Sequence, residues 1–176
     1  GMFSGMINLE QDLSNWHFVK IDEKPKDFDS LTDKWEEEHK PKWGVESEDV
    51  VTWIGTDGKI HKTKIPETDG TIDIFDPVNE IYPVEIVDWG KSSDILNIKI
   101  NLGATWKIPG VLEKVPSSAP MWTNNFSSLF FSQPKFNDPN VTNWDTSHVT
   151  SMEDMFATAS SFNQPIGDWD VSNVTN

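Results

Sequence analysis

A short string that returns after 25 residues constrains this fold more than any other feature of the chain. WDTSHVT at 144–150 comes back as WDVSNVT at 169–175, with five of the seven residues unchanged. Repeats with a period of roughly 20 to 50 residues are typical of proteins in which each copy buries its apolar side chains against its neighbours. The period therefore predicts a solenoid in which equivalent residues stack in ladders.

The apolar positions of the repeat occur in three copies. The last copy is the fullest, the copy before it lies 25 or 26 residues earlier, and one inserted residue near 137–143 explains the difference. A partial copy with the same internal spacings opens the chain. We expect these positions to form the repeat core: Met2, Phe3, Leu9, Trp16, Phe126, Leu129, Phe130, Phe136, Trp144, Val149, Met152, Met155, Phe156, Phe162, Trp169 and Val174.

Each copy combines two local patterns. VTSMEDMF at 149–156 has apolar residues at helical spacings, which predicts a short helical turn. FNQPIGDWDV at 162–171 predicts a short extended segment, and the Asn, Asp, Ser and Thr around it suit tight turns because their side chains bond nearby backbone groups.

These strings carry a family resemblance. MFATASSFNQPIGDWDVSNVT, at 155–175, resembles the repeat of the BspA-like leucine-rich surface proteins, the DUF285 family, which occurs in mycoplasma lipoproteins and in surface proteins of other bacteria. Residues 114–150 are similar to the segment that opens such an array, and residues 15–44 resemble one that closes it. Leu9-Glu10-Gln11 and His17-Phe18 depart from the family pattern, which suggests a degenerate terminal coil.

The order of these segments predicts the domain organisation. Residues 1–43 would be the end of a repeat array with a capping helix over 27–39, residues 44–110 a small β-domain, and residues 111–176 the start of a second array with about two coils. The predicted fold class is α+β, with short leucine-rich-repeat-like solenoid pieces at both ends flanking a small antiparallel β-domain. This order suggests a fragment or one module of a longer tandem protein, the alternative being a short protein with eroded repeats.

The middle of the chain has the patterns of strands. Two β-rich runs flank Asp57-Gly58, a dipeptide that tolerates the positive φ of a tight hairpin turn. Apolar and polar residues alternate over 96–102, as a half-buried strand requires. Pro83 suggests an edge strand or a bulge. We expect four to six mostly antiparallel strands here.

Composition excludes several classes of function. The net charge of -15 opposes binding to nucleic acid or to an anionic membrane, and no apolar run is long enough to span a bilayer. The chain has no Cys, and its four His are scattered among different segments without a metal-ligand pattern. It also lacks the phosphate-binding and nucleophile motifs that enzymes use. We therefore expect no catalytic residue, no metal and no cofactor.

The candidate ligand-binding residues are the tryptophans outside the repeat period: Trp53, Trp89, Trp106 and Trp122. Burial is the usual fate of Trp, and an exposed one would mark a binding surface. The repeat aromatics could instead form an exposed platform, although a core ladder is favoured. The exposure of each indole in the structure therefore decides whether that tryptophan remains a candidate for ligand binding.

The leading functional hypothesis is a non-catalytic module of a bacterial cell-surface or secreted protein that binds a protein or carbohydrate ligand outside the cell, as in adhesion. Location at the cell surface and adhesion are what the resemblance implies. One alternative is an architectural spacer that self-associates head to tail through its solenoid ends. Another is a glycoside hydrolase with paired carboxylates, although the sequence singles out no pair.

Overall fold

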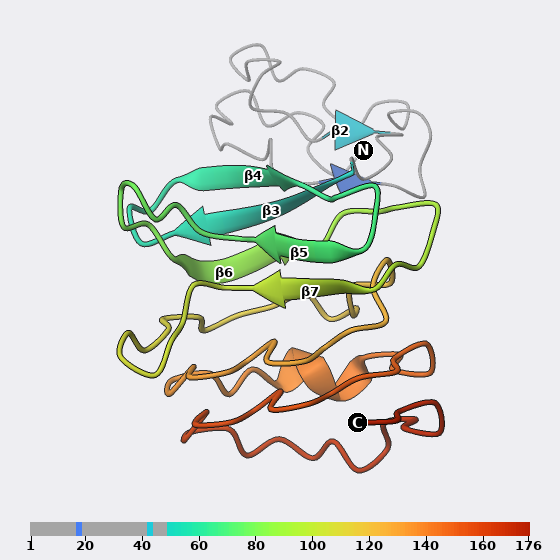
Figure 1. The fold of residues 1–176 in the computed structure, drawn as a ribbon. Helices are drawn as coiled ribbons and strands as arrows, with labels where there is room; N and C mark the ends of the chain where they lie inside the picture. Colours follow the sequence, from blue (N-terminus) through green and yellow to red (C-terminus); the bar gives the residue numbers. More distant parts are fainter. Residues whose placement is uncertain (1–16, 19–41, 44–48) are drawn as a thin grey trace, which may run out of the picture. The chain divides into compact units, whose positions relative to one another are not determined.

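The computed structural model describes residues 17–18, 42–43 and 49–176, and the chain divides into two compact units, residues 1–48 and 49–176. In the first unit β1 (His17–Phe18) and β2 (Lys42–Trp43) pair in parallel. The second unit holds the remaining described strands, β3 to β7, with the two later copies of the repeat beneath them (Figure 1). The expected capping helix at 27–39 and the core positions Met2, Phe3, Leu9 and Trp16 lie outside the described residues.

An antiparallel sheet in the order β4-β3-β6 begins the second unit. β3 (Val50–Gly55) and β4 (Ile60–Lys64) form the expected hairpin, and Gly58 in its turn has a φ of 74°. β6 (Pro83–Asp88) pairs with the other edge of β3, and its register shifts where Pro83 lies opposite Gly55. This register shift confirms the bulge that Pro83 suggested. Its physical reason is that proline cannot donate a hydrogen bond to the ladder.

The second sheet is parallel, which the sequence reading did not anticipate. β5 (Gly70–Asp73) pairs with β7 (Ile98–Asn101), so that Gly70 lies opposite Ile98. Ile98 and Ile100 are buried, whereas Lys99 and Asn101 point to the other face, as the alternation over 96–102 predicted. This outward face is important because the candidate site lies on it.

The predicted α+β fold with solenoid pieces at both ends is wrong. The described residues contain no α-helix, one 3-10 helix, η2 (Pro139–Asn143), and small sheets, and no solenoid is evident. The segment expected as a helical turn, 149–156, is a series of turns, with Met155 N–H donating to the Met152 carbonyl at 3.1 Å. Spacings of three and four residues fit consecutive turns as well as they fit a helix.

Backbone geometry explains why this segment is not helical. Asp154 and Thr158 have φ values of 52° and 60°, and the equivalent Ser128 and Ser132 of the preceding copy have 58° and 52°. A right-handed helix requires a φ near about −63°. Alternate N–H groups of 126–132 donate to carbonyls of 151–157, each bond 2.8 Å long, so these groups are not available for helical hydrogen bonds within their own copy.

The two described copies lie against each other through matching aromatic rings. Trp144 stacks on Trp169, with ring centres 6.3 Å apart and planes at 4°. Phe136 stacks on Phe162 at 6.0 Å and 1°. The indole N–H of Trp169 donates to the Val141 carbonyl at 2.9 Å, and that of Trp144 to the Pro116 carbonyl at the same distance. The rings thus combine apolar packing with satisfied donors.

One hydrophobic core runs through the whole second unit, from Val51 of the hairpin to Trp169 of the last copy. Each expected repeat-core residue in the described part belongs to it or packs against it. The buried members are Phe126, Leu129, Phe130, Phe136, Trp144, Val149, Met155 and Trp169, and the partly buried ones are Met152, Phe156, Phe162 and Val174. Strands and repeat copies therefore support each other.

Candidate functional site: an exposed tryptophan beside a groove

The four off-period tryptophans have different environments. Trp53, Trp89 and Trp122 are buried, and the Trp122 indole N–H donates to the Trp89 carbonyl at 2.7 Å. Trp106 is 76% exposed. Because an indole of this size is usually covered, Trp106 is the one of the four that remains a binding candidate.

A closed turn holds Trp106 in place. The Thr105 N–H donates to the Ile108 carbonyl at 2.8 Å, and the Thr105 hydroxyl oxygen accepts from the N–H groups of Ile108 and Lys107 at 2.9 and 3.2 Å. The Phe131 ring lies against the indole at 84°, with centres 4.6 Å apart. Trp106 is therefore an exposed platform whose backbone and ring are both supported, so little order has to be gained on binding.

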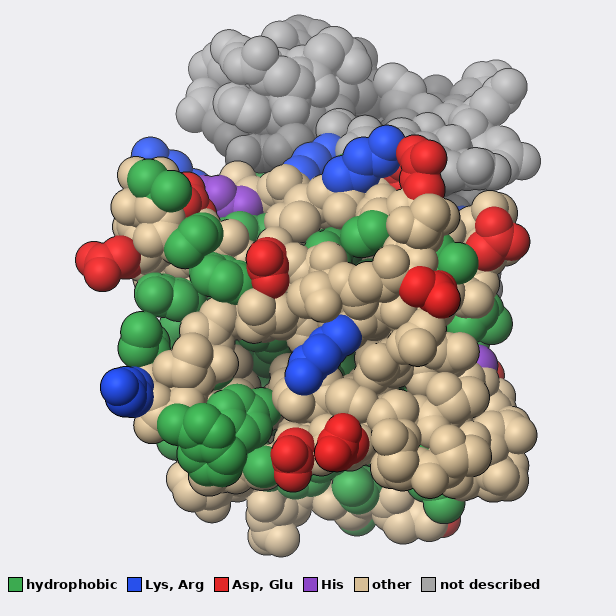
Figure 2. Space-filling model, viewed as in Figure 1, with side chains coloured by type: hydrophobic (Ala, Val, Ile, Leu, Met, Phe, Trp, Pro, Cys, Tyr) green, Lys and Arg blue, Asp and Glu red, His purple; other side chains and the backbone are tan. Residues whose placement is uncertain are grey.

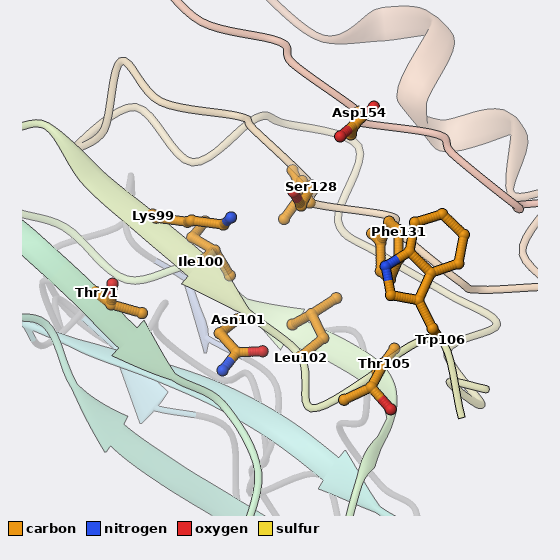
Figure 3. A pocket seen from close by; sticks show the side chains of 12 residues that line it. Thr71, Lys99, Ile100, Asn101, Leu102, Thr105, Trp106, Ser128, Phe131 and Asp154 are labelled. Carbon is orange, nitrogen blue, oxygen red and sulfur yellow. The ribbon is translucent and has the colours of Figure 1, made fainter. Parts of the chain in front are cut away.

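A groove of about 560 Å³ adjoins this platform. Trp106 and Phe131 lie together on one side of it, and Lys99, Ser128 and Asp154 also line it (Figure 3). Its volume is in the range of small-molecule sites, roughly 300 to 1,000 Å³. Figure 2 shows a hydrophobic cluster next to acidic and basic side chains on the surface of the second unit.

The floor of the groove is the outward face of the parallel sheet. Thr71 comes from β5, and Lys99 and Asn101 come from β7, which places them on this face through strand alternation. The Asn101 amide donates to Asp73 at 2.7 Å, and its oxygen accepts from the Gly103 N–H at 3.0 Å. Asn101 therefore fixes the start of the loop that carries Trp106.

A second hollow of about 400 Å³ shares Lys99 with the groove. All the residues that line it are polar, among them Asn97, Asn125, Ser127, Ser151 and Glu153. Asn125 donates to the Asn97 side chain at 2.8 Å, and the hydroxyls of Ser127 and Ser151 lie 2.5 Å apart. Lys99 thus lines both the groove beside Trp106, the aromatic groove, and this second hollow, the polar hollow.

The charged side chains that line the two hollows are few: Lys99, Glu153 and Asp154. Lys99 is half-buried, and its ammonium forms no side-chain hydrogen bond or ion pair with other described residues. Asp154 and Glu153 are exposed neighbours in sequence, each lining one of the two hollows. An ammonium group with three donors and two carboxylates with several acceptors can form hydrogen bonds with a polar ligand.

Within the part of the chain that the structure describes, no three His, Cys, Asp or Glu side chains converge on a possible metal position. No helix in that part is long and apolar enough to cross a membrane. The described chemistry at the candidate site is therefore that of hydroxyl, amide, ammonium, carboxylate and indole groups.

Comparison with known families supports part of the resemblance. Residues 121–176 match the family described as "Mycoplasma protein of unknown function, DUF285", which is the stretch that contains the two described repeat copies. No curated protein and no solved structure matches the chain. These findings therefore show a segment that matches DUF285 at 121–176, preceded in the described part of the chain by a strand-rich segment.

The sequence named Trp106 as one of four candidate tryptophans and did not name the residues around it. Lys99 and Asn101 could have been placed on an outward face from the alternation in their strand. Phe131, Ser128 and Asp154 belong to the repeat copies, and no local pattern shows that the loop after β7 meets them.

Proposed function

We propose that this chain is a non-catalytic, ligand-binding module of a bacterial cell-surface or secreted protein of the BspA-like kind, and that the Trp106 groove is its binding site. The observation that carries the proposal is the 76% exposure of an indole held rigidly beside a 560 Å³ groove. An aromatic anchor of this kind is enriched at binding sites because it covers much area at little entropic cost.

Location outside the cell and a role in adhesion rest on the resemblance of the repeat alone, because the family matched over 121–176 is described as one of unknown function. These are arguments from likeness, and they identify no ligand. The net charge of -15 favours a partner that is neutral or cationic overall and disfavours nucleic acid.

Binding is favoured over hydrolysis by the positions of the carboxylates. A glycoside hydrolase holds a pair of carboxyl groups on opposite sides of the scissile bond, one of them in apolar surroundings. Among the residues that the structure describes around the two hollows, the carboxylates are Asp154 and Glu153, which are adjacent in sequence and both exposed. This arrangement suits recognition of a polar ligand.

The test measures the affinity of two proteins, the wild-type chain and the Trp106→Ala variant, for immobilised extracellular-matrix proteins and oligosaccharides. Biolayer interferometry gives both affinities. Met121→Ala is the matched control, because Met121 is also an exposed apolar residue, at 45%, but lies outside the groove. We expect Trp106→Ala to lose about tenfold or more in affinity and the control to keep it. Unchanged binding by Trp106→Ala would contradict the proposal.

A second candidate, an architectural unit that self-associates, is favoured by the apolar side chains of the last copy. Met152, Phe156, Phe162 and Val174 are only partly buried, and Val171 is 54% exposed. Sedimentation velocity across a range of concentrations tests this candidate. Oligomers that disappear with Val171→Asp would favour assembly through this surface, and a monomer at every concentration would exclude it.

A further inference from the structure

Two hollows on one face, joined at a single lysine, point to an elongated polar ligand. The aromatic groove and the polar hollow both include Lys99 in their lining. Lys99 is at the second position of β7, and the repeat copies line both hollows, whereas the Trp106 loop lines the aromatic groove only. A ligand that contacts both hollows must cross this lysine.

We infer that the ligand is an oligosaccharide of at least two sugar units, with one ring stacked on Trp106 and the next held over Lys99 in the polar hollow. This inference rests on the proposed function and names its ligand class. The exposed indole face offers a flat apolar surface, which complements the C–H face of a pyranose ring.

The polar hollow suits a sugar because every residue lining it can donate or accept hydrogen bonds. A sugar hydroxyl is both a donor and an acceptor, so it can accept from the Lys99 ammonium and donate to the Glu153 carboxylate. Four of these side chains bond each other in two pairs, Asn125 with Asn97 at 2.8 Å and Ser127 with Ser151, which holds them in place before a ligand arrives.

A peptide fits this surface less well. Peptides that extend a sheet need a free strand edge, and apolar peptide side chains need apolar pockets. The groove floor is a sheet face from which Thr71, Lys99 and Asn101 project, and the adjoining hollow has no apolar lining residue in the described part of the chain. Apolar lining residues, among them Leu102, Leu129 and Phe131, lie only in the groove beside Trp106, so this surface covers an apolar peptide side chain at one end and not at the other.

The experiment measures binding by isothermal titration calorimetry to hexasaccharides of the malto, cello, chito, xylo, laminari and hyaluronan series and to their mono- and disaccharides. We expect at least one series to bind, with its disaccharide and longer forms about fivefold or more tighter than its monosaccharide, because the longer forms contact both hollows. Trp106→Ala should weaken binding of all lengths about tenfold or more.

Lys99→Met tests the junction, with Lys91→Met as the control, since Lys91 is an exposed lysine outside both hollows. Lys99→Met should remove most of the length preference, and Lys91→Met should leave it unchanged. A length preference that survives Lys99→Met would overturn the two-hollow arrangement.

The same variants are then titrated with the extracellular-matrix proteins and with peptides derived from them, so that the two proposals can fail separately. Trp106-dependent binding to a peptide, with no binding to any saccharide, would overturn the oligosaccharide inference and leave the proposed binding function standing. No Trp106-dependent binding to any saccharide, protein or peptide would overturn both.

Discussion

Trp144 should contribute more to stability than its equivalent in the last copy, Trp169, because it is enclosed on more sides. The ring of Trp144 lies near four other aromatic rings, whose centres are 5.7 to 6.3 Å away: those of Trp89, Phe126, Phe130 and Trp169. Trp169 lies near the rings of Trp144 and Phe156. Both indoles donate a hydrogen bond of 2.9 Å to a backbone carbonyl.

The substitutions Trp144→Phe and Trp169→Phe remove equivalent hydrogen bonds and differ in the packing that is lost. Leaving the Pro116 carbonyl without its donor costs about 1 kcal/mol. The vacated volume adds about 1 to 2 kcal/mol, since truncating a buried Trp to Ala costs about 3 to 5 kcal/mol. We expect about 2 to 3 kcal/mol for Trp144→Phe and about 1 to 2 kcal/mol for Trp169→Phe.

Urea unfolding followed by far-ultraviolet circular dichroism measures both variants without relying on Trp fluorescence. An equal slope of the free energy of unfolding against urea in all three proteins would show that the denatured states are comparable. A loss under about 0.5 kcal/mol for Trp144→Phe would refute the reasoning, as this is the range of neutral surface substitutions. So would a larger loss for Trp169→Phe.

Three further predictions concern the loop, the acid response and the platform. Gly103→Ala should lower the free energy of unfolding by about 1 to 3 kcal/mol in the same assay, because Gly103 has a φ of 79° and an added Cβ would lie 2.8 Å from the Tyr82 ring. Hydrogen bonds from the serines two residues on lower the pKa values of Asp145 and Asp170, so the stability they give is present above about pH 4 and lost as the pH falls through the lowered values. The double variant with Asn at both positions should therefore show a shallower loss of thermal midpoint on acidification than the wild type, and an equal slope would contradict this. Trp106→Ala should change the free energy of unfolding by no more than about 0.5 kcal/mol, because the indole is mostly exposed, and a larger loss would show that it is part of the core.

The packing of the repeat residues could be anticipated because apolar side chains that recur at one spacing pack against their equivalents in the next copy. Phe136 and Phe162 recur 26 residues apart and stack at 1°, and the sequence predicted such a ladder. The helical turn at 149–156 could not be judged from spacing alone. Asp154 adopts a positive φ there, and Met155 accepts a hydrogen bond from Phe130 in the preceding copy, a contact that no local pattern reveals.

Of the residues that line the candidate site, the sequence named only Trp106 as a candidate for ligand binding. Trp106 was one of four candidates, and the sequence offered no signal to separate it from Trp122, whose indole donates to a buried carbonyl. Lys99 became informative only once β7 was placed against β5 and beside the repeat copies. Both the exposure of Trp106 and the position of Lys99 depend on packing between segments tens of residues apart, which local patterns do not show.

Fluorine NMR of the 5-fluorotryptophan-labelled chain tests most directly whether ligand binds at Trp106. The chain has nine Trp, and the Trp106 resonance is identified as the one that disappears in Trp106→Phe. Titration with the hexasaccharide that binds best in calorimetry should shift this resonance and leave those of the buried Trp53, Trp89 and Trp122 in place. If the Trp106 resonance stays unchanged at saturation while another shifts, the groove is not the binding site.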